Sequence, residues 1–545
     1  MGETGGDFVA DYVVVGAGSA GCAVAARLSE DPSVSVVLLE AGSRDWYPWI
    51  HIPVGYFKTM GNPAFDWCYK TQADPGLNDR RLSWPRGKVL GGSSSLNGLL
   101  YVRGQAEDYD RWRQMGCEGW GWDDVLPLFK RAEDQERGED DYHGVGGPLT
   151  VSDMRLSRPI CDAWVEAAQA AGYPFNPDYN GASQEGVGYF QLTARKGRRC
   201  SAAVAYLKPA RDRANLKIAT KAPARRILFD GDRATGVEFG SPGGARVAKA
   251  RREVILCSGA INSPQLLMLS GIGPRDRLAE HGIETRRDAP AVGQGLQDHL
   301  QARLVFKCNE PTLNDEVRSL MNQARIALTY AATRSGPMTM AASLATGFLK
   351  TGDHVATPDI QFHIQPWSAD TPQEGVHPFS AFTMSVCQLR PESRGRIELT
   401  SNRPEDHPAI HPNYLATETD RRTIVAGVDI ARRIATYEPL KSKISAAHAP
   451  TDDVQGYDDT LDWVRRTAVT IYHPTGTCRM GADEGSVVDA RLRVRGVKGL
   501  RVADASIMPE IVSGNTNAPC IMIGERCADL VREDHAARTH EAVPA

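Results

Sequence analysis

The sequence predicts an α/β protein in which a parallel-sheet domain is interrupted by an inserted α+β domain with an antiparallel sheet. Two observations support this fold class. The chain opens with an apolar strand, a glycine turn, a helix and a second apolar strand, the order of a βαβ unit. Between about residues 300 and 470, short segments instead alternate between apolar and polar side chains, which is typical of antiparallel strands.

The length and composition describe a globular protein of more than one domain. A chain of 545 residues is too long for one core, since single cores stop growing near roughly 250–300 residues. Its hydrophobic fraction of 41% and charged fraction of 24% are ordinary. The net charge of −4 gives no indication of a nucleic-acid partner.

Cysteine usage and the N-terminus favour a cytoplasmic location. The eleven cysteines include no C-x-x-C pair, which argues against a disulfide scaffold or a structural zinc site. We see no basic and apolar leader before the first strand, and no run of about eighteen apolar residues that could span a membrane. The sequence therefore predicts no transmembrane segment and no metal site, and leaves the oligomeric state open.

The opening βαβ unit has the features of an adenine-dinucleotide site. Gly16 allows a tight turn after the first strand, Gly18 lets a pyrophosphate approach the backbone, and Gly21 lets the helix pack closely. The helix over 20–28 directs its free N–H groups at the phosphates. Glu40 ends the second strand nineteen residues after Gly21, near the distance at which an acid meets the ribose hydroxyls. The motif does not distinguish NAD from FAD.

A second glycine turn, Gly91-Gly92-Ser93-Ser94-Ser95, offers further backbone N–H groups. A flexible linker is the alternative, but apolar residues bound the turn on both sides. We therefore expect a second approach of the backbone to the cofactor, at its pyrophosphate or at a ring edge.

The remaining elements follow from periodicity and turn residues. We expect loops over 46–85 and a hairpin over 222–239 that turns at Asp230-Gly231. Helices are predicted at 106–115, 122–133, 160–171, 263–270, 419–437 and 518–532, and strands at 12–15, 36–40, 253–257, 359–366, 381–390, 396–400 and 500–503. These elements assign 1–155, 215–305 and 482–545 to a discontinuous cofactor domain, and 156–214 and 306–481 to a substrate-binding domain.

Two residues near the C-terminal end are the candidate catalytic groups. Pro474 disfavours helical geometry for His473, whose imidazole, with an ordinary pKa of about 6.5, can accept a proton at neutral pH. Other histidines also lie in loop-like segments, so local sequence alone does not single out His473. Asn517 stands at a helix N-cap position, where its alternative role is purely structural. Pairing His473 with Cys478 as zinc ligands lacks further ligands at metal spacing.

With these pieces in order, the sequence resembles the glucose–methanol–choline (GMC) oxidoreductases, flavoproteins that oxidise alcohols. The resemblance covers nearly the whole chain. Its motifs lie at 86–104, 259–274 and 292–299, in the His-Pro-Thr-Gly-Thr-Cys segment from His473, and in the Ser-Gly-Asn-Thr-Asn-Ala-Pro segment from Ser513. The resemblance implies a Rossmann-like FAD-binding domain of the glutathione-reductase type, with FAD rather than NAD as the cofactor.

The resemblance also implies roles for individual residues. His473 is expected to be the active-site base and Asn517 its partner. Leu96 stands where covalent-flavin members carry a histidine, so FAD is expected to bind non-covalently. Asn97 is expected against the flavin and Asp504 at the ribityl chain. The full set of expected cofactor-binding residues is Gly16, Gly18, Ser19, Ala20, Gly21, Glu40, Ala41, Arg86, Val89, Gly91, Gly92, Ser93, Asn97, Gly98, Ala224, Ser258, Asp504, Ala505, Asn515 and Thr516.

The implied reaction is FAD-dependent oxidation of a primary alcohol to an aldehyde, with His473 taking the hydroxyl proton and hydride passing to flavin N5. The expected partners are a small-molecule alcohol and an electron acceptor, which is a quinone, a dye-like acceptor or oxygen. Through that acceptor the protein could be peripheral to the inner membrane. The alternatives are an aryl or furanic alcohol oxidase that produces hydrogen peroxide, and a lyase or photodecarboxylase on the same scaffold. A serine hydrolase is poorly supported, because the sequence contains no G-x-S-x-G motif.

Overall fold

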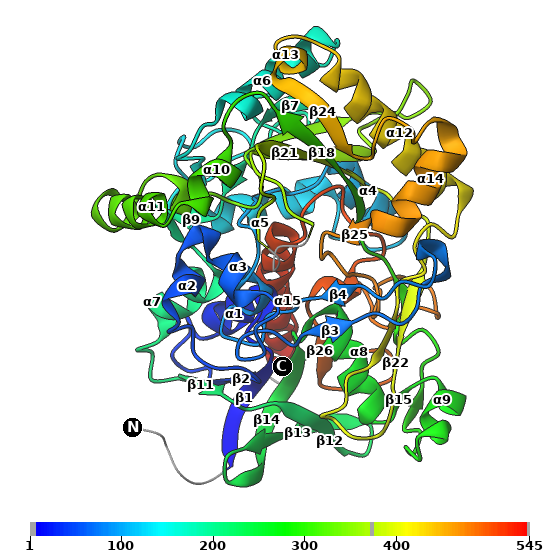
Figure 1. The fold of residues 1–545 in the computed structure, drawn as a ribbon. Coiled ribbons are helices and arrows are strands. Elements are labelled where there is room, and N and C mark those ends of the chain that lie inside the picture. The colour runs from blue at the N-terminus through cyan, green and yellow to red at the C-terminus, as the bar shows by residue number, and fades with distance from the viewer. Residues whose placement is uncertain (1–6, 371–374, 542–545) are drawn as a thin grey trace.

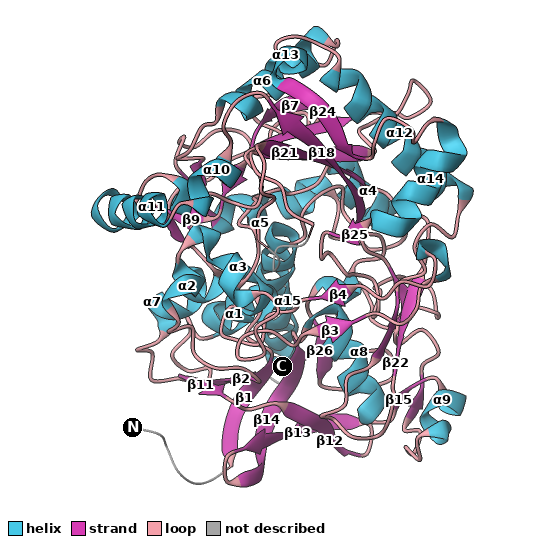
Figure 2. Ribbon diagram, viewed as in Figure 1, coloured by secondary structure: helices cyan, strands magenta, loops and turns pink. Residues whose placement is uncertain are grey.

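The computed structural model describes residues 7–370 and 375–541, and it contains two large sheets stacked one above the other. In Figure 1 the lower sheet collects strands from the beginning, middle and end of the chain, and the upper sheet collects one strand from its first half and the others from its second half. Figure 2 shows helices packed around both sheets, with long loops between the two levels. The expected α/β class with an inserted antiparallel sheet is confirmed.

The lower sheet is the predicted nucleotide-binding type. Within the described residues it has seven strands in the order β11-β2-β1-β14-β13-β12, with β26 also paired to β14. The neighbours β11, β2, β1, β14 and β26 run parallel, and β12, β13 and β14 form an antiparallel meander. Their bounds are β1 Phe8–Val15, β2 Val36–Glu40, β11 Leu216–Thr220, β12 Ala224–Asp230, β13 Arg233–Ser241, β14 Gly244–Leu256 and β26 Leu500–Val502.

The order of these strands brings distant parts of the chain to one edge. Val13, Val14 and Leu38 are completely buried, as expected for central strands covered on both faces. The helix α1 (Ser19–Leu28) packs beside α15 (Asn517–Glu541), so the start and the end of the chain share one layer. The carboxyl ends of β1 and β2 therefore face the beginning of α15, at the edge where α/β sheets bind ligands.

The upper sheet is wholly antiparallel. Counting only the part of the chain that the structure describes, it has seven strands in the order β24-β18-β21-β20-β19-β7, and β25 also pairs with β18. The helices α6 (Pro159–Ala170), α12 (Glu418–Ala435) and α14 (Gly456–Thr467) contact this sheet. The strand bounds are β7 Gly186–Tyr189, β18 Leu300–Cys308, β19 Ala345–Leu349, β20 Ile360–Gln365, β21 Ala381–Gln388, β24 Ile444–Ala449 and β25 Val469–Thr470.

Most predicted elements appear within two or three residues of their expected ends, although several extend further. The hairpin is β12 and β13, and the predicted helices are α4 (Ala106–Gln114), α5 (Trp122–Ala132), α6, α8 (Gly259–Leu269), α12 and α15. Two expectations differ from the structure. The segment 396–400 contributes β22 (Gly395–Glu398) to a separate small sheet with β17 (Gln294–Leu296) and β23 (Ala409–His411), because its partners come from loops between the two large sheets. The expected loops over 46–85 also contain short elements: α2 Pro48–His51, α3 Tyr56–Thr59, β3 Tyr69–Lys70 and β4 Ser83–Trp84.

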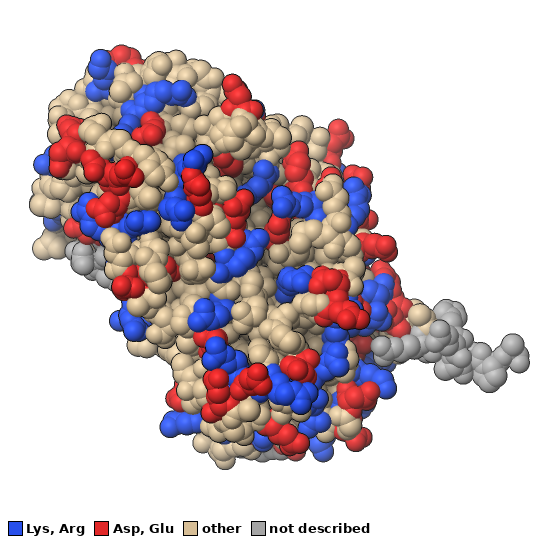
Figure 3. Space-filling view, turned by 90° about the vertical axis from the view of Figure 1, so that its right-hand side faces the viewer, with Lys and Arg blue, Asp and Glu red and all other residues tan. Residues whose placement is uncertain are grey.

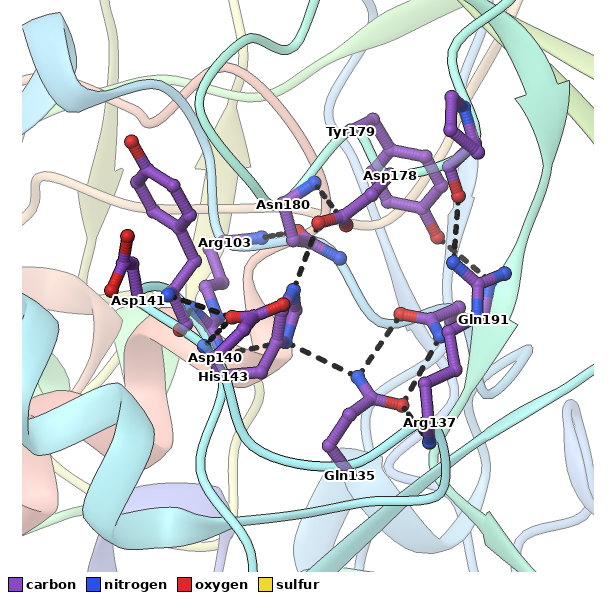
Figure 4. Close-up of polar contacts among 12 residues, drawn as sticks. Arg103, Gln135, Arg137, Asp140, Asp141, His143, Asp178, Tyr179, Asn180 and Gln191 are labelled. Atoms are coloured by element: carbon purple, nitrogen blue, oxygen red, sulfur yellow. Dashed lines mark hydrogen bonds and ion pairs between the residues drawn. The ribbon is translucent and has the colours of Figure 1, made fainter.

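A buried charged cluster joins segments that the sequence assigned to different domains. The Arg103 guanidinium lies 2.6 Å from the Glu133 carboxylate and is inaccessible to solvent. His143 bridges Glu133 and Asp178, with contacts of 3.1 and 3.0 Å. Figure 4 shows His143 between the Arg103 side and the 178–180 loop. The cluster thus ties the segment after the second glycine turn to the loops beside β7.

The ionisation of His143 depends on these partners. Burial lowers the pKa of His143, but hydrogen bonds to Asp178 and Glu133 outweigh burial and raise it to about 9. A group whose pKa is higher in the folded state stabilises that state below its unfolded pKa, about 6.5 for histidine. The stabilisation is lost as the pH rises through the folded pKa.

We predict that the contribution of His143 to stability disappears in alkaline solution. The difference in unfolding free energy between the wild type and His143→Gln should shrink by about 3 kcal/mol between pH 6 and pH 9.5. Urea unfolding at the two pH values measures this, with the exposed His354→Gln as the control. A difference that is the same at both pH values would show that His143 is not charged in the folded protein.

Candidate active site

A cavity of about 800 Å³ lies between the two sheets and connects the predicted cofactor residues with the predicted base. One end is lined by Gly16, Gly18 and Glu40, at the carboxyl edge of the lower sheet. The other end is lined by His473 and by side chains of the upper sheet, including Gln301 of β18. The cavity has the size of a site for a small-molecule ligand or cofactor.

The first glycine turn is shaped by close backbone contacts. Gly16 has φ +99°, and a Cβ there would lie 2.5 Å from the Cys257 carbonyl oxygen. A Cβ on Gly21 would lie 1.9 Å from the Gly16 carbonyl oxygen, so the helix packs directly on the turn. Gly18, by contrast, has only one neighbour, at 3.8 Å, and leaves space toward the cavity. The backbone contacts at Gly16 and Gly21 are those predicted from their spacing, and the open space at Gly18 is compatible with the predicted approach of a pyrophosphate.

Glu40 closes this end of the cavity. Its two carboxylate oxygens accept hydrogen bonds from the backbone N–H groups of Gly42, at 2.8 Å, and Ala17, at 2.9 Å. Burial raises its pKa to about 7. Glu40 thus fixes the turn and lies at the position expected for a ribose-binding acid.

The second glycine turn packs against the first. The Gly91 N–H donates to the Ala17 carbonyl oxygen at 2.8 Å, and a Cβ on Gly92 would lie 2.7 Å from the Gly18 Cα. Gly92 and Ser93 line the cavity. The absence of side chains on both turns lets two backbones meet beside the cavity, which supports the predicted second approach to the cofactor.

The far wall comes from the end of the chain. Asp504 accepts hydrogen bonds from the Gly259 N–H at 2.9 Å and the Ser263 hydroxyl at 2.6 Å, and burial raises its pKa. Asn517 begins α15, and its Oδ1 accepts a hydrogen bond from the Ser19 hydroxyl at 2.8 Å. The N-termini of α1 and α15 thus meet at the cavity, and helix N-termini favour anionic groups.

These features fit FAD. A dinucleotide needs an acid at its ribose, an open glycine at its pyrophosphate and donors along its length, and the cavity supplies all three. Most predicted cofactor residues line the cavity; Gly21, Val89 and Gly91 are exceptions and pack behind its wall. The lining set is Gly16, Gly18, Ser19, Ala20, Glu40, Ala41, Arg86, Gly92, Ser93, Asn97, Gly98, Ala224, Ser258, Asp504, Ala505, Asn515 and Thr516.

A hydrogen bond from its backbone N–H fixes the position of His473. Its N–H donates to the Asp298 carboxylate at 2.6 Å, and the same carboxylate accepts the Thr470 hydroxyl at 2.5 Å and the Tyr414 hydroxyl. Burial raises the pKa of Asp298 to about 6. The preceding residue, Tyr472, has φ +69°, a left-handed conformation that is sparsely populated and needs support from its surroundings. The Tyr472 carbonyl is bound by Arg86 at 2.6 Å.

A chain of hydrogen bonds determines where His473 carries its proton. His299 Nε2 lies 2.9 Å from the Leu389 carbonyl oxygen, which can only accept, so His299 Nε2 carries a hydrogen. Burial lowers the pKa of His299 to about 4, so its ring is neutral and its Nδ1 is an acceptor. His473 Nδ1 lies 3.0 Å from that atom and must therefore be the donor.

His473 consequently presents an unprotonated Nε2. Its pKa lies well below its ordinary value because of burial, with further contributions from His299 and His363. The neutral ring with its hydrogen on Nδ1 has a free lone pair on Nε2. This is the form that a general base requires.

The predicted partner of His473 is corrected by the structure. Asn515 Nδ2, not Asn517, lies 3.2 Å from His473 Nε2. The Asn515 Oδ1 lies 3.4 Å from the Gln361 amide, so its Nδ2 is oriented to donate. Asn517 cannot take this role because its side chain is bound to Ser19 at the start of α1.

Several residues of this end were not identified from sequence. Asp298 and His299 lie in the motif segment 292–299, but no role was assigned to them. Their contact with His473 arises because β18 and β25 pair at Leu300 and Thr470, a register that no local pattern reveals.

Among the described residues, no cluster of three or more His, Cys, Asp and Glu side chains could hold a metal ion.

Comparisons with known proteins show relatives over nearly the whole chain. A family model described as GMC oxidoreductase matches residues 10–301, and a second with the same description matches residues 391–524. The alcohol dehydrogenase [acceptor] of Pseudomonas putida is 44% identical over 96% of this chain and 95% of its own length. The mitochondrial choline dehydrogenase of Homo sapiens is 44% identical over 96% of this chain and 89% of its own length.

A solved structure shows the same fold. The pyridoxine 4-oxidase from Mesorbium loti superposes with a TM-score of 0.87 and 33% identity, covering 96% of this chain and 99% of that one. The match extends over both sheets and therefore over both walls of the cavity. The chain belongs to the GMC oxidoreductase family and is an FAD-dependent oxidoreductase that acts on CH–OH donors.

Proposed function

We propose that the protein oxidises a primary alcohol to an aldehyde, with His473 as the base and Asn515 as the donor to the substrate oxygen. The single observation that carries this proposal is the unprotonated Nε2 of His473, fixed through His299 and the Leu389 carbonyl and paired with Asn515. Bound FAD supplies the acceptor for the hydride that leaves the alcohol carbon.

The residues act on the hydroxyl group in two ways. A substrate hydroxyl placed between His473 and Asn515 donates its hydrogen to Nε2 and accepts from the Asn515 amide. As the proton moves to Nε2, the ring becomes a cation whose Nδ1–H still donates to the neutral His299. Proton transfer to a positioned base contributes about 10²–10⁴-fold to the rate. The amide stabilises the negative charge that develops on oxygen.

Non-covalent FAD is part of this proposal. Leu96 is buried and has no nucleophilic atom, which supports FAD held only by the walls of the cavity. We also propose that the residues assigned to the discontinuous cofactor domain hold FAD, and that those of the inserted domain select the alcohol.

We further propose a cytoplasmic location. The eleven cysteines are all unpaired, which supports a reducing compartment.

The electron acceptor is proposed from the relatives. The Pseudomonas putida protein is named a dehydrogenase with an unspecified acceptor, and on that basis we favour a dehydrogenase that uses a quinone or a dye-like acceptor. The Mesorbium loti protein is named an oxidase, which keeps an oxygen-using alcohol oxidase as the alternative. Comparing hydrogen peroxide formation with dye reduction distinguishes the two.

The charge of the substrate end disfavours choline, although a relative is named for it. Gln301 and Arg303 both line the cavity, on the same face of β18 because side chains two apart in a strand share a face. The Arg303 guanidinium donates to the Asp370 carbonyl oxygen at 3.2 Å, and within the described residues no carboxylate forms an ion pair with it. Trp367 and Tyr472 also line the cavity. Asp370 also lines the cavity, but its carboxylate is 78% exposed and pairs with His377 at 3.2 Å. A quaternary ammonium group beside Arg303 would therefore meet a cation.

We predict different effects for the two asparagines. Asn515→Ala should slow anaerobic flavin reduction by roughly 10²–10³-fold while FAD stays bound, because it removes a donor to the reacting oxygen. Asn517→Ala should weaken FAD retention with a small effect on the rate, because it breaks the contact between α15 and α1. His473→Ala is the reference for a lost base. If Asn517→Ala has the large rate effect and Asn515→Ala does not, the corrected pairing is wrong.

His299 is predicted to be a positioning residue. His299→Phe should slow flavin reduction by roughly 10²-fold, because Nδ1–H of His473 loses its acceptor. His299→Gln can accept from His473 and donate to Leu389, and should restore most of the rate.

The pH profile separates this role from a packing defect. In the wild type, kcat/KM should stay constant near neutral pH and fall only as the pH drops through the low pKa of His473. In His299→Phe that apparent pKa should rise toward its ordinary value, because one cause of its depression is gone. A slower variant with an unchanged profile would contradict the positioning role.

We predict that the enzyme prefers a neutral alcohol to choline. 3,3-Dimethylbutan-1-ol has the shape of choline without its charge, and its kcat/KM should be roughly tenfold higher or more. Arg303→Gln should reduce this ratio mainly by improving choline. A wild-type preference for choline that Arg303→Gln leaves unchanged would contradict the charge argument.

A further inference from the structure

The helix α11 (Leu320–Thr333) carries large apolar side chains into solvent. Leu320, Met321 and Leu328 are 81%, 82% and 71% exposed. They repeat at helical spacing, with the exposed Ala324 between them, so they form one continuous stripe along the helix. In Figure 1 α11 projects from the side of the molecule, away from both sheets.

This stripe is unusual for the molecule. A surface helix normally turns its apolar stripe to the core, and isolated exposed apolar residues need no explanation. Here the inward side of α11 is held by one buried residue, Tyr330, whose hydroxyl donates to the Gly197 carbonyl oxygen at 3.1 Å. Tyr330 therefore attaches the helix to the molecule, and the apolar stripe faces outward.

The charges beside the stripe are mostly positive. Arg318, just before α11, pairs with Asp315 at 2.8 Å, but Arg325 and Arg334 follow in a segment from Val317 to Leu349 that contains no acid. The Tyr330 contact also places α11 beside the hairpin β9–β10 (Ala194–Arg195 and Arg198–Arg199), which exposes Lys196 and Arg198 next to Gly197. Figure 3, which shows the side of the molecule opposite α11, has basic and acidic side chains interspersed.

We propose that α11 and the β9–β10 hairpin form a docking surface for an anionic phospholipid membrane. An amphipathic helix with an apolar stripe and flanking arginines lies in the membrane interface, with its apolar side chains among the acyl chains and its cations at the headgroups. The positive charge selects this occupant over a second copy of the chain, because two such surfaces repel each other.

The position of α11 connects this surface with the cavity. The short helix after it, η5 (Pro337–Thr339), packs against η1 (Pro53–Gly55), and the chain then reaches Ala342 and Ser343 in the cavity wall. Docking through α11 therefore holds this side of the cavity close to the bilayer. A lipid-soluble acceptor or alcohol then has a short path to the active site.

Vesicle flotation of the FAD-loaded protein tests the proposal. The wild type should float with vesicles of equal parts phosphatidylcholine and phosphatidylglycerol, and much less with phosphatidylcholine alone. Raising NaCl from about 0.1 M to about 1 M should weaken binding to the anionic vesicles, because salt screens the arginines. Equal binding to both vesicle types, or no binding to the anionic ones, would overturn the proposal.

Two sets of variants locate the surface. Leu320→Ser/Met321→Ser/Leu328→Ser should reduce partition by at least about tenfold. Arg325→Gln/Arg334→Gln should reduce it by about tenfold on anionic vesicles alone. The matched control Val145→Ser/Phe175→Ser removes apolar side chains that are 49% and 48% exposed elsewhere, and should bind as the wild type does.

The same samples also serve to check that the variants fold and to determine their oligomeric state. All variants should keep bound FAD and reduce a soluble dye at the wild-type rate, because none of the substituted residues lies at the active site. If sedimentation shows a wild-type dimer that the triple variant loses, and the vesicles bind nothing, the surface is an interface between copies and the membrane proposal is wrong.

Discussion

The active site depends on one buried carboxylate. Asp298 accepts hydrogen bonds from the His473 backbone and from the Thr470 and Tyr414 hydroxyls. Without it, three buried polar groups would lose their partner, which costs on the order of 1–3 kcal/mol for each. It also anchors the segment that carries His299 to the segment that carries His473. The positions of His299 and His473 therefore depend on a hydrogen bond from the His473 backbone to the Asp298 carboxylate.

The two ends of the cavity are built by different means. At the cofactor end, glycines bring backbone segments together, and the N–H groups of turns and helix ends provide the binding surface. At the other end, side chains of an antiparallel sheet line the cavity, and Gln301 and Arg303 are among them. The first construction suits a cofactor that every family member shares. The second can change by single substitutions, so names of relatives do not determine the alcohol.

The cofactor end was largely predictable from sequence because its signals are local. The spacing of Gly16, Gly18 and Gly21 predicts two close backbone contacts and one open position, and the structure has close contacts at Gly16 and Gly21 and open space at Gly18. The substrate end was less predictable because its contacts join distant segments. His299 and His473 are 174 residues apart and meet only through the pairing of β18 and β25. Family resemblance led to His473, but not to the asparagine that faces it.

The same limit applies to Asn515 and to α11. Asn515 and Asn517 are two residues apart in one motif, and only the Ser19 contact shows that Asn517 faces the cofactor end. The spacing of Leu320, Ala324 and Leu328 is helical in the sequence, but periodicity cannot tell whether such a stripe faces the core or the solvent. Both distinctions depend on tertiary structure.

The central claim is that the Leu389 carbonyl, acting through His299, leaves His473 neutral with its hydrogen on Nδ1. Neutron diffraction from crystals of the oxidised, FAD-loaded protein grown near neutral pH measures this directly. The account predicts deuterium on His299 Nε2 and on His473 Nδ1, and none on His473 Nε2. Deuterium on His473 Nε2 would contradict the account, because that nitrogen could not then accept the proton of an alcohol.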